Sequence, residues 1–139
     1  MKEDPCSFYR LIIGSDSHLR RINNKRRLNV VSAIVIHRQG KGARYFWQRT
    51  SGKDCHSLRE KMYLETTTSL NLAQVFVPKI NKVLNGSDNY ALEIHIDVGR
   101  SGDTRDMIKE LVGMVNGSGF TAKTKPDSYG ASKVADKHT

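Results

Sequence analysis

Cysteine and long apolar runs are scarce in this sequence, and each of these two shortages excludes a class of protein. The 139 residues include 2 Cys, 3 Pro and 1 Trp. Cys6 and Cys55 lie far apart without a C-x-x-C pair, so they indicate neither a disulfide framework nor a zinc site, and we expect reduced thiols in a cytoplasmic protein. The longest uncharged apolar stretch, residues 30–36, is far shorter than the ~20 residues that span a bilayer. Residues 1–7 lack the apolar core of a secretory signal, so we expect no membrane association.

Acidic residues are also in deficit. The chain has 14 Asp and Glu against 23 Lys and Arg, which gives a net charge of +9. This excess favours a polyanionic partner, most commonly nucleic acid, and the alternative is a basic surface that only keeps the protein in solution. With 37% hydrophobic residues the chain is too apolar for a disordered protein, and its length suits one domain over residues 1–139.

The first third of the chain predicts three antiparallel strands. Residues 8–13 are typical of a buried strand that ends at the turn-forming residues 14–17. A basic segment with an Asn-Asn turn signal follows over residues 18–28. Residues 29–38 are rich in β-branched side chains, and a short glycine turn separates them from residues 43–49, which indicates a hairpin.

Helices and strands alternate in the rest of the chain. Ser57–Glu60 form a capping box that opens a helix reaching Ile80, which Pro78 should kink or divide. Alternating apolar residues predict a strand over residues 89–98, and Asp103 is a plausible N-cap for the next helix.

A fifth strand over residues 120–125 and a last helix from Ala131 complete the pattern. The predicted order is βββαβαβα, an α/β fold. Strands that are separated by helices pair in parallel through right-handed crossovers, so we expect a mixed five-stranded sheet with helices on its faces.

Four acidic residues stand out by their positions in this pattern. Asp16 follows the first predicted strand and Asp97 ends the fourth, so adjacent parallel strands would bring both carboxylates to one edge of the sheet. Glu65 lies at the centre of the apolar stripe of the first helix, where an ionised carboxylate needs a cation or hydrogen-bond donors. Asp136 is the fourth candidate, on the last helix.

Such a cluster would suit divalent metal ions. Neighbouring carboxylates raise one another's pKa values, and a divalent cation reverses that repulsion. Oxygen ligands without Cys or paired His fit Mg²⁺ or Mn²⁺ better than zinc. Two such ions can activate a water and stabilise the leaving oxygen of a phosphoryl displacement. The alternative is that Asp16 and Asp97 only cap turns after their strands.

Four segments of the sequence also carry a family resemblance. They are Ile13–Ser17, Tyr63–Glu65, Ile94–Gly99 and Lys125–Asp136. Together they resemble the ribonuclease H-like proteins of the YkuK family, a largely uncharacterised bacterial group. The resemblance implies a sheet in the order 3-2-1-4-5 and an acidic site built from the first strand, the first helix, the fourth strand and the final helix. Those catalytic and metal-binding roles fall on Asp16, Glu65, Asp97 and Asp136.

Basic and aromatic side chains provide candidate contacts to nucleic acid. One basic segment lies next to Asp16 and further lysines lie near Asp136, and such groups supply salt-sensitive affinity for phosphates. The candidates are Arg20, Arg21, Lys25, Arg26, Arg27, Lys123, Lys125 and Lys133. For Tyr45 and Trp47, core packing is the first interpretation and stacking on bases the second.

The leading hypothesis is a nuclease that uses two Mg²⁺ or Mn²⁺ ions on RNA, RNA–DNA hybrid or structured DNA. A non-catalytic nucleic-acid-binding module is the alternative, and a domain that binds an acidic protein is a third reading. Sequence does not distinguish the substrates, because groove shape and 2′-hydroxyl contacts decide them. For His95, a half-exposed strand residue or a partnered histidine is preferred to a catalytic one. For His138, a frayed terminal residue is preferred to a proton shuttle.

Overall fold

A computed structural model describes residues 9–38, 42–54, 57–83, 90–96 and 105–124 of the chain. Within these residues the order of elements is βββαβαβ, as predicted, and the helix expected from Ala131 lies outside them. The elements are β1 (Tyr9–Ile22), β2 (Lys25–Arg38), β3 (Gly42–Asp54), α1 (Leu58–Val83), β4 (Tyr90–His95), α2 (Arg105–Gly117) and β5 (Thr121–Lys123).

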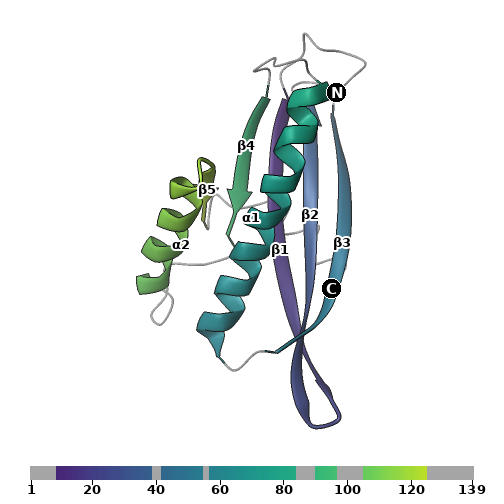
Figure 1. Cartoon of the computed structure of the whole chain (residues 1–139), viewed down its shortest axis with the longest axis vertical. Coiled ribbons are helices and arrows are strands. Elements are labelled where there is room, and N and C mark those ends of the chain that lie inside the picture. Colours follow the sequence, from purple (N-terminus) through teal and green to yellow (C-terminus); the bar gives the residue numbers. More distant parts are fainter. Residues whose placement is uncertain (1–8, 39–41, 55–56, 84–89, 97–104, 125–139) are drawn as a thin grey trace.

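The five strands form one mixed sheet in the order β3-β2-β1-β4-β5, which confirms the predicted topology (Figure 1). β1, β2 and β3 pair antiparallel, whereas β4 pairs in parallel with β1 on one side and with β5 on the other. β4 and β5 each follow a helix, because a parallel neighbour is reached only through a crossover connection. This order puts β1, the strand that carries Asp16, at the centre of the sheet.

The first strand is longer than the sequence suggested. The prediction that it ends at Gly14 is wrong: β1 continues to Ile22, and each of its residues from Tyr9 to Ile22 has a partner in β2. The two-residue turn is formed by Asn23 and Asn24, with φ of 52° and 63°. Asparagine tolerates this left-handed conformation, and two positive φ values suit the twist of a tight hairpin. The predicted Asn-Asn turn is therefore confirmed, and the basic segment belongs to the hairpin strands.

Helix α1 is continuous over Leu58–Val83, so of the two predicted effects of Pro78, a kink or a division, the division is wrong. Proline removes the donor for the carbonyl of the residue four positions earlier, Gln74. Both residues are exposed, so water can satisfy that carbonyl. At the other end, the Ser57 hydroxyl accepts a hydrogen bond from the backbone N–H of Glu60 at 3.1 Å, which confirms the predicted N-cap.

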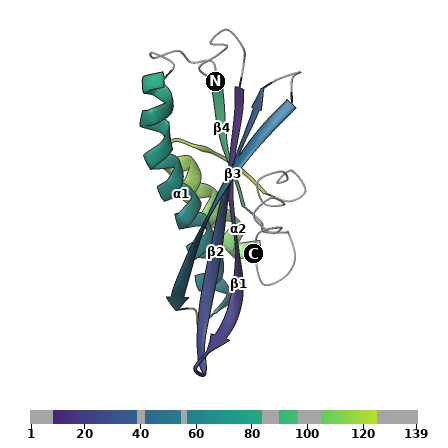
Figure 2. The same cartoon turned by 90° about the vertical axis from the view of Figure 1, so that its right-hand side faces the viewer.

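Both helices pack against the same face of the sheet (Figures 1 and 2). The hydrophobic core lies between these helices and the sheet and contains residues from β1, β2, α1, β4 and α2. Its fully buried members include Ile13, Ala73, Ile94 and Leu111. Two small, buried side chains of α1, Ser69 and Ala73, let the helix lie close to the strands, and Ser69 contacts Ser15 of β1. Neither helix among the described residues is both long and apolar enough to cross a membrane.

Candidate active site

Asp16 lies inside β1 and not at its end, which corrects the sequence-based placement. Its partner in β2 is Val31, and the β1–β4 pairing stops at the pair Gly14–His95. Asp16 is therefore two residues beyond the end of β4, at the edge of the parallel part of the sheet. Its side chain is largely buried, and one carboxylate oxygen, Oδ2, lies 3.8 Å from Nε2 of His18.

Glu65 projects from α1 into the layer between the helix and the sheet, and only 5% of it is exposed. Its Oε1 accepts hydrogen bonds from the Ser17 backbone N–H at 3.0 Å and from the Ser17 hydroxyl at 2.6 Å. Lys61, one helical turn earlier, has its Nζ 3.4 Å from the same oxygen. The carboxylate of Glu65 is thus fixed to the residue that follows Asp16.

The pKa of Glu65 is raised above its ordinary value of 4.5, mainly because burial disfavours the charged form. The Ser17 hydroxyl and the Lys61 ammonium oppose this shift, whereas the negative charge of Asp16 adds to it. Asp16 and Glu65 are therefore close enough to repel each other. A buried carboxylate beside another one is stabilised by a proton or by a cation.

The two carboxylates approach β1 from opposite sides. Successive side chains of a strand point to opposite faces, and Ser17 faces α1 because it bonds to Glu65. Asp16 accordingly lies on the face away from α1, together with its neighbour His18. Glu65 reaches the strand at the Ser17 N–H, which lies between the two faces. A cation shared by both carboxylates would sit at this point of β1.

A chain of buried hydroxyls holds α1 against the sheet beside this point. The Ser15 Oγ lies 2.8 Å from the Ser32 Oγ of β2 and 2.7 Å from the Ser69 Oγ of α1. Ser15 bridges the other two hydroxyls, so each of the three groups has a hydrogen-bond partner in an otherwise apolar layer. The chain fixes the distance between helix and strand at the level where Glu65 meets Ser17.

The other two predicted acids, Asp97 and Asp136, lie outside the described residues, as does His138. Among the residues that are described, no group of three His, Cys, Asp or Glu side chains is arranged to hold a metal ion. The structure thus brings Glu65 to the neighbour of Asp16, and the full set of four acids stays a prediction.

The predicted nucleic-acid contacts fall into two groups. Arg20, Arg21 and Lys25 are exposed on the β1–β2 hairpin, which extends beyond both helices in Figure 1. Arg27 pairs with Asp54 of β3 at 3.1 Å. Lys123 lies at the end of β5. The side chain of Arg26 and the whole of Lys125 and Lys133 are outside the described parts of the structure.

A second charged cluster links β1 and β4 on the face that carries Asp16. The Arg10 guanidinium donates to both oxygens of Glu93, at 2.6 Å and 2.9 Å. Nε2 of His95, which is buried, lies 3.2 Å from Glu93 Oε1. These contacts, led by the Arg10 hydrogen bond, lower the pKa of Glu93 to about 2. Of the two non-catalytic interpretations of His95, the partnered histidine is confirmed and the half-exposed strand residue is wrong, because His95 is buried.

This cluster yields a stability prediction. We expect Glu93→Gln to lower the free energy of unfolding by about 1–2 kcal/mol at neutral pH. The variant loses the negative charge that strengthens the partly buried hydrogen bonds from Arg10. The Glu93 pKa is lower in the folded state, so its contribution is complete above about pH 4.5 and is lost as the pH falls toward about 2. Urea unfolding at about pH 7 and about pH 4 measures both effects.

The matched control for Glu93→Gln is Glu110→Gln. Glu110 also pairs with an arginine, Arg59 at 2.6 Å, but both side chains are about half exposed. Its replacement should change stability by less than about 0.5 kcal/mol. An equal loss in both variants, or a Glu93→Gln loss that does not shrink at low pH, would contradict the assignment.

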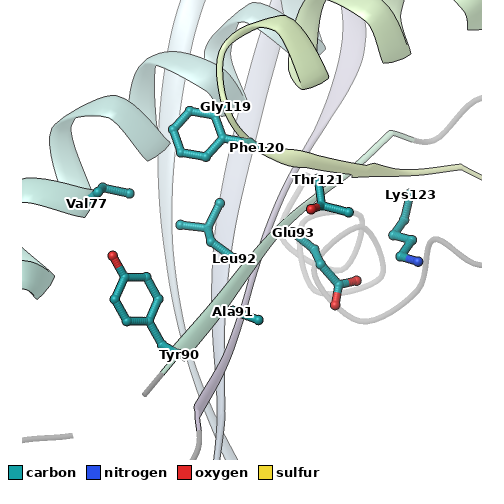
Figure 3. Close-up of a pocket in the computed structure, with 9 residues that line it drawn as sticks. All are labelled: Val77, Tyr90, Ala91, Leu92, Glu93, Gly119, Phe120, Thr121 and Lys123. Carbon is teal, nitrogen blue, oxygen red and sulfur yellow. The ribbon is translucent and has the colours of Figure 1, made fainter. Parts of the chain in front are cut away.

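A pocket of about 500 Å³ opens between β4 and β5 (Figure 3). Tyr90, Leu92 and Phe120 line its apolar side, and Figure 3 shows Glu93 and Lys123 together at its other end. Glu93 is already bound by Arg10, and neither Asp16 nor Glu65 lines the cavity. The pocket is separate from the pair of buried acids.

Several residues that shape the candidate site were not among those predicted from the sequence. Lys61 precedes Glu65 by four residues, a spacing that places two side chains together on a helix. His18 follows Asp16 by two residues, a spacing that puts both on one face of a strand. These two signals were present in the sequence. The contacts of Ser17 and Arg10 depend on the packing of distant segments, so no local pattern indicates them.

Three comparisons with known proteins found similar sequences and structures. A family model described as Ribonuclease H-like matches residues 1–139. The uncharacterized protein YkuK of Bacillus subtilis (strain 168) is 36% identical to this chain over an alignment of 152 residues. The alignment covers 100% of this chain and 84% of that protein. The NurA nuclease from Sulfolobus solfataricus has a TM-score of 0.45 and 18% identity, over 79% of this chain and 35% of the nuclease chain. The present chain thus corresponds to about a third of that nuclease. By the family match and the identity to YkuK, the chain belongs to the ribonuclease H-like family.

Proposed function

We propose that this protein is a metal-dependent nuclease that hydrolyses phosphodiester bonds in nucleic acid. The observation that carries the proposal is the position of Glu65, whose buried carboxylate is bound to the strand residue next to Asp16. Two carboxylates from different elements at one point of a sheet are the oxygen ligands that Mg²⁺ and Mn²⁺ prefer. Membership in the ribonuclease H-like family supports the same assignment.

The chemistry of Glu65 fits a cation. Among the described residues, its hydrogen bonds and its ion pair all fall on Oε1, which leaves Oε2 for a further partner. Its raised pKa reflects a charge that burial leaves poorly solvated, and a cation would compensate that charge. Bound Mg²⁺ or Mn²⁺ would supply a Lewis acid that activates water and stabilises the leaving oxygen in a two-metal site.

We assign Asp97 and Asp136 as the remaining ligands. Asp97 follows His95 by two residues, as Asp16 follows Gly14, and Gly14 and His95 are the last pair of the β1–β4 ladder. Asp136 takes the place of the fourth acid by its resemblance to the family pattern. Ser17 and Lys61 would orient Glu65, and the hydroxyls of Ser15 and its partners would hold α1 at the required distance from β1.

The charge of the chain supports nucleic acid as the substrate. The exposed side chains of Arg20, Arg21 and Lys25 extend from the same strand pair that carries Asp16. Each phosphate that such side chains neutralise adds affinity that decreases with salt. We therefore propose that the hairpin binds the backbone of the substrate and that the acidic pair lies at the scissile phosphodiester.

The test is a panel of labelled substrates that includes RNA, RNA–DNA hybrid, branched DNA and single strands. Each is incubated with Mg²⁺, with Mn²⁺ and with a chelator, and the products are separated on a denaturing gel. The proposal predicts cleavage of at least one substrate that stops when the metal is chelated. Salt-sensitive binding without turnover on the whole panel would instead identify a non-catalytic nucleic-acid-binding module.

A further inference from the structure

We propose that the outer face of β3 is a binding surface for single-stranded nucleic acid, on which bases stack on Tyr45 and Trp47. The inference deepens the proposed function, because it names the class of nucleic acid, but it concerns binding and does not depend on turnover. The outer face is the one that points away from the helices. β3 is an edge strand of the sheet, and two of its large aromatic residues are unusually exposed, Tyr45 by 48% and Trp47 by 46%.

The two rings lie on the same face of the sheet as Asp16. Directly paired residues of antiparallel strands share a face. Asp16 pairs with Val31, and Val31 pairs with Arg49. Trp47 and Tyr45 precede Arg49 by two and four residues, so their side chains point the same way. Two strand spacings of about 4.8 Å place Arg49 roughly 10 Å from Asp16 across the sheet.

The chemistry of this surface suits unpaired bases. The Arg49 guanidinium lies 6.0 Å from the centre of the Trp47 ring, so a positive charge accompanies an aromatic face. Alternate residues of a strand are about 6.8 Å apart, twice the roughly 3.4 Å rise of stacked bases, a spacing that admits one base between the two side chains. Bases of a duplex are already paired and stacked, so only a single strand can offer them.

Charge favours a polyanion over a second copy of the chain as the occupant. An exposed edge strand can also pair with the same strand of another molecule. Two copies that paired along β3 would bring the Arg44 and Arg49 side chains of both molecules together at one seam, and the repulsion between like charges opposes such a dimer. Both arginines are exposed, and the chain carries a net charge of +9.

The experiment uses the single tryptophan of the chain as a local probe. Oligothymidylate and oligouridylate of about 12 nucleotides are titrated into the full chain in a chelating buffer, so that cleavage plays no part. We expect quenching of the Trp47 fluorescence by single strands and not by duplexes of equal length. By anisotropy of a labelled strand, Tyr45→Leu and Trp47→Leu should each bind about 5- to 100-fold more weakly.

Two further variants complete the test. Arg49→Gln should lower the slope of log affinity against log salt by about 0.7 for a single strand. Phe46→Leu is the control, because Phe46 is also exposed on β3 but pairs with Ile34 on the face toward the helices, and it should leave affinity unchanged. Single-strand binding that neither quenches Trp47 nor weakens in Trp47→Leu would overturn the inference. So would a dimer in sedimentation that Trp47→Leu dissociates, because β3 would then bind a second copy.

The outcomes separate this inference from the nuclease proposal. Quenching and weakened binding in the β3 variants, with no cleavage on any substrate, would support the surface and contradict the nuclease. Metal-dependent cleavage of a single strand at an unchanged KM in Trp47→Leu would support the nuclease and contradict the surface.

Discussion

Asp16→Asn is expected to lower the rate of metal-dependent cleavage by about a thousandfold or more while leaving the protein folded. Asparagine keeps the shape of the side chain but removes its charge, and stabilisation of transition-state charge by a metal is worth several kcal/mol. The metal-free variant should unfold at the same temperature or a slightly higher one, because Asp16 and Glu65 repel each other in the wild type. Initial rates on the best substrate of the panel and a thermal melt measure the two effects.

Asp54→Asn is the matched control for this experiment. Asp54 is an exposed aspartate of the same sheet, on β3, and it pairs with Arg27 at the surface. Its replacement should leave the rate within about threefold of wild type, since an exposed ion pair contributes little. A rate in Asp16→Asn that matches the Asp54→Asn rate would refute the assignment of Asp16 to the active site.

Glu65→Gln is expected to abolish most of the stabilisation that Mn²⁺ gives to the wild-type protein. Saturation at about 100 times Kd stabilises a folded protein by about 2.7 kcal/mol, which corresponds to roughly 5–10 °C in Tm for a chain of this size. Glutamine can still accept the two hydrogen bonds from Ser17, so the fold should persist. It offers a cation no charge, so Mn²⁺ should shift the Tm of the variant little.

The raised pKa of Glu65 adds a pH dependence to this prediction. The folded state holds the Glu65 proton more tightly than the unfolded chain does, so metal-free stability falls as the pH rises from about 4.5 through the raised value. A cation must displace that proton, so the apparent Mn²⁺ affinity should rise with pH over the same interval. Both trends should be absent in Glu65→Gln. Calorimetric titration of Mn²⁺ between about pH 5 and about pH 8 measures the affinity.

The control for this variant is Glu60→Gln, which changes an exposed glutamate on the same helix. Glutamine also serves in a capping box, so helix α1 should keep its N-cap. Glu60→Gln should therefore bind Mn²⁺ with the affinity and pH dependence of the wild type. If Mn²⁺ stabilises Glu65→Gln as strongly as it stabilises Glu60→Gln, Glu65 does not hold the ion.

Sequence patterns predicted the succession of strands and helices along the chain because the relevant signals are local, whereas the order of the strands within the sheet was implied by the family resemblance. The capping box at Ser57–Glu60 marks the start of α1, and the alternation around Ile94 marks β4. The prediction failed where pairing between distant segments decides the structure. Residues 14–17 are typical of a turn, but their backbone groups pair with β2, so β1 continues through them. The Asp16 side chain is thereby held by a rigid strand.

The surroundings of Glu65 were predicted in part. Glu65 was expected to need donors or a cation, and the structure provides Ser17 and Lys61. The pair Arg10–Glu93 spans 83 residues of sequence and exists only because β1 and β4 pair in one register. The pattern of residues within one strand does not show how that strand is aligned with its neighbour, since side chains from two strands meet only after the sheet forms.

The most direct test of the central claim is an anomalous-difference map of a crystal of this protein grown or soaked with Mn²⁺. The account predicts a peak within coordination distance, about 2.1 Å, of the Asp16 carboxylate and of Glu65 Oε2, and no such peak in crystals of Asp16→Asn. A well-ordered map in which both carboxylates contact only protein groups, with Mn²⁺ absent or bound elsewhere, would contradict it.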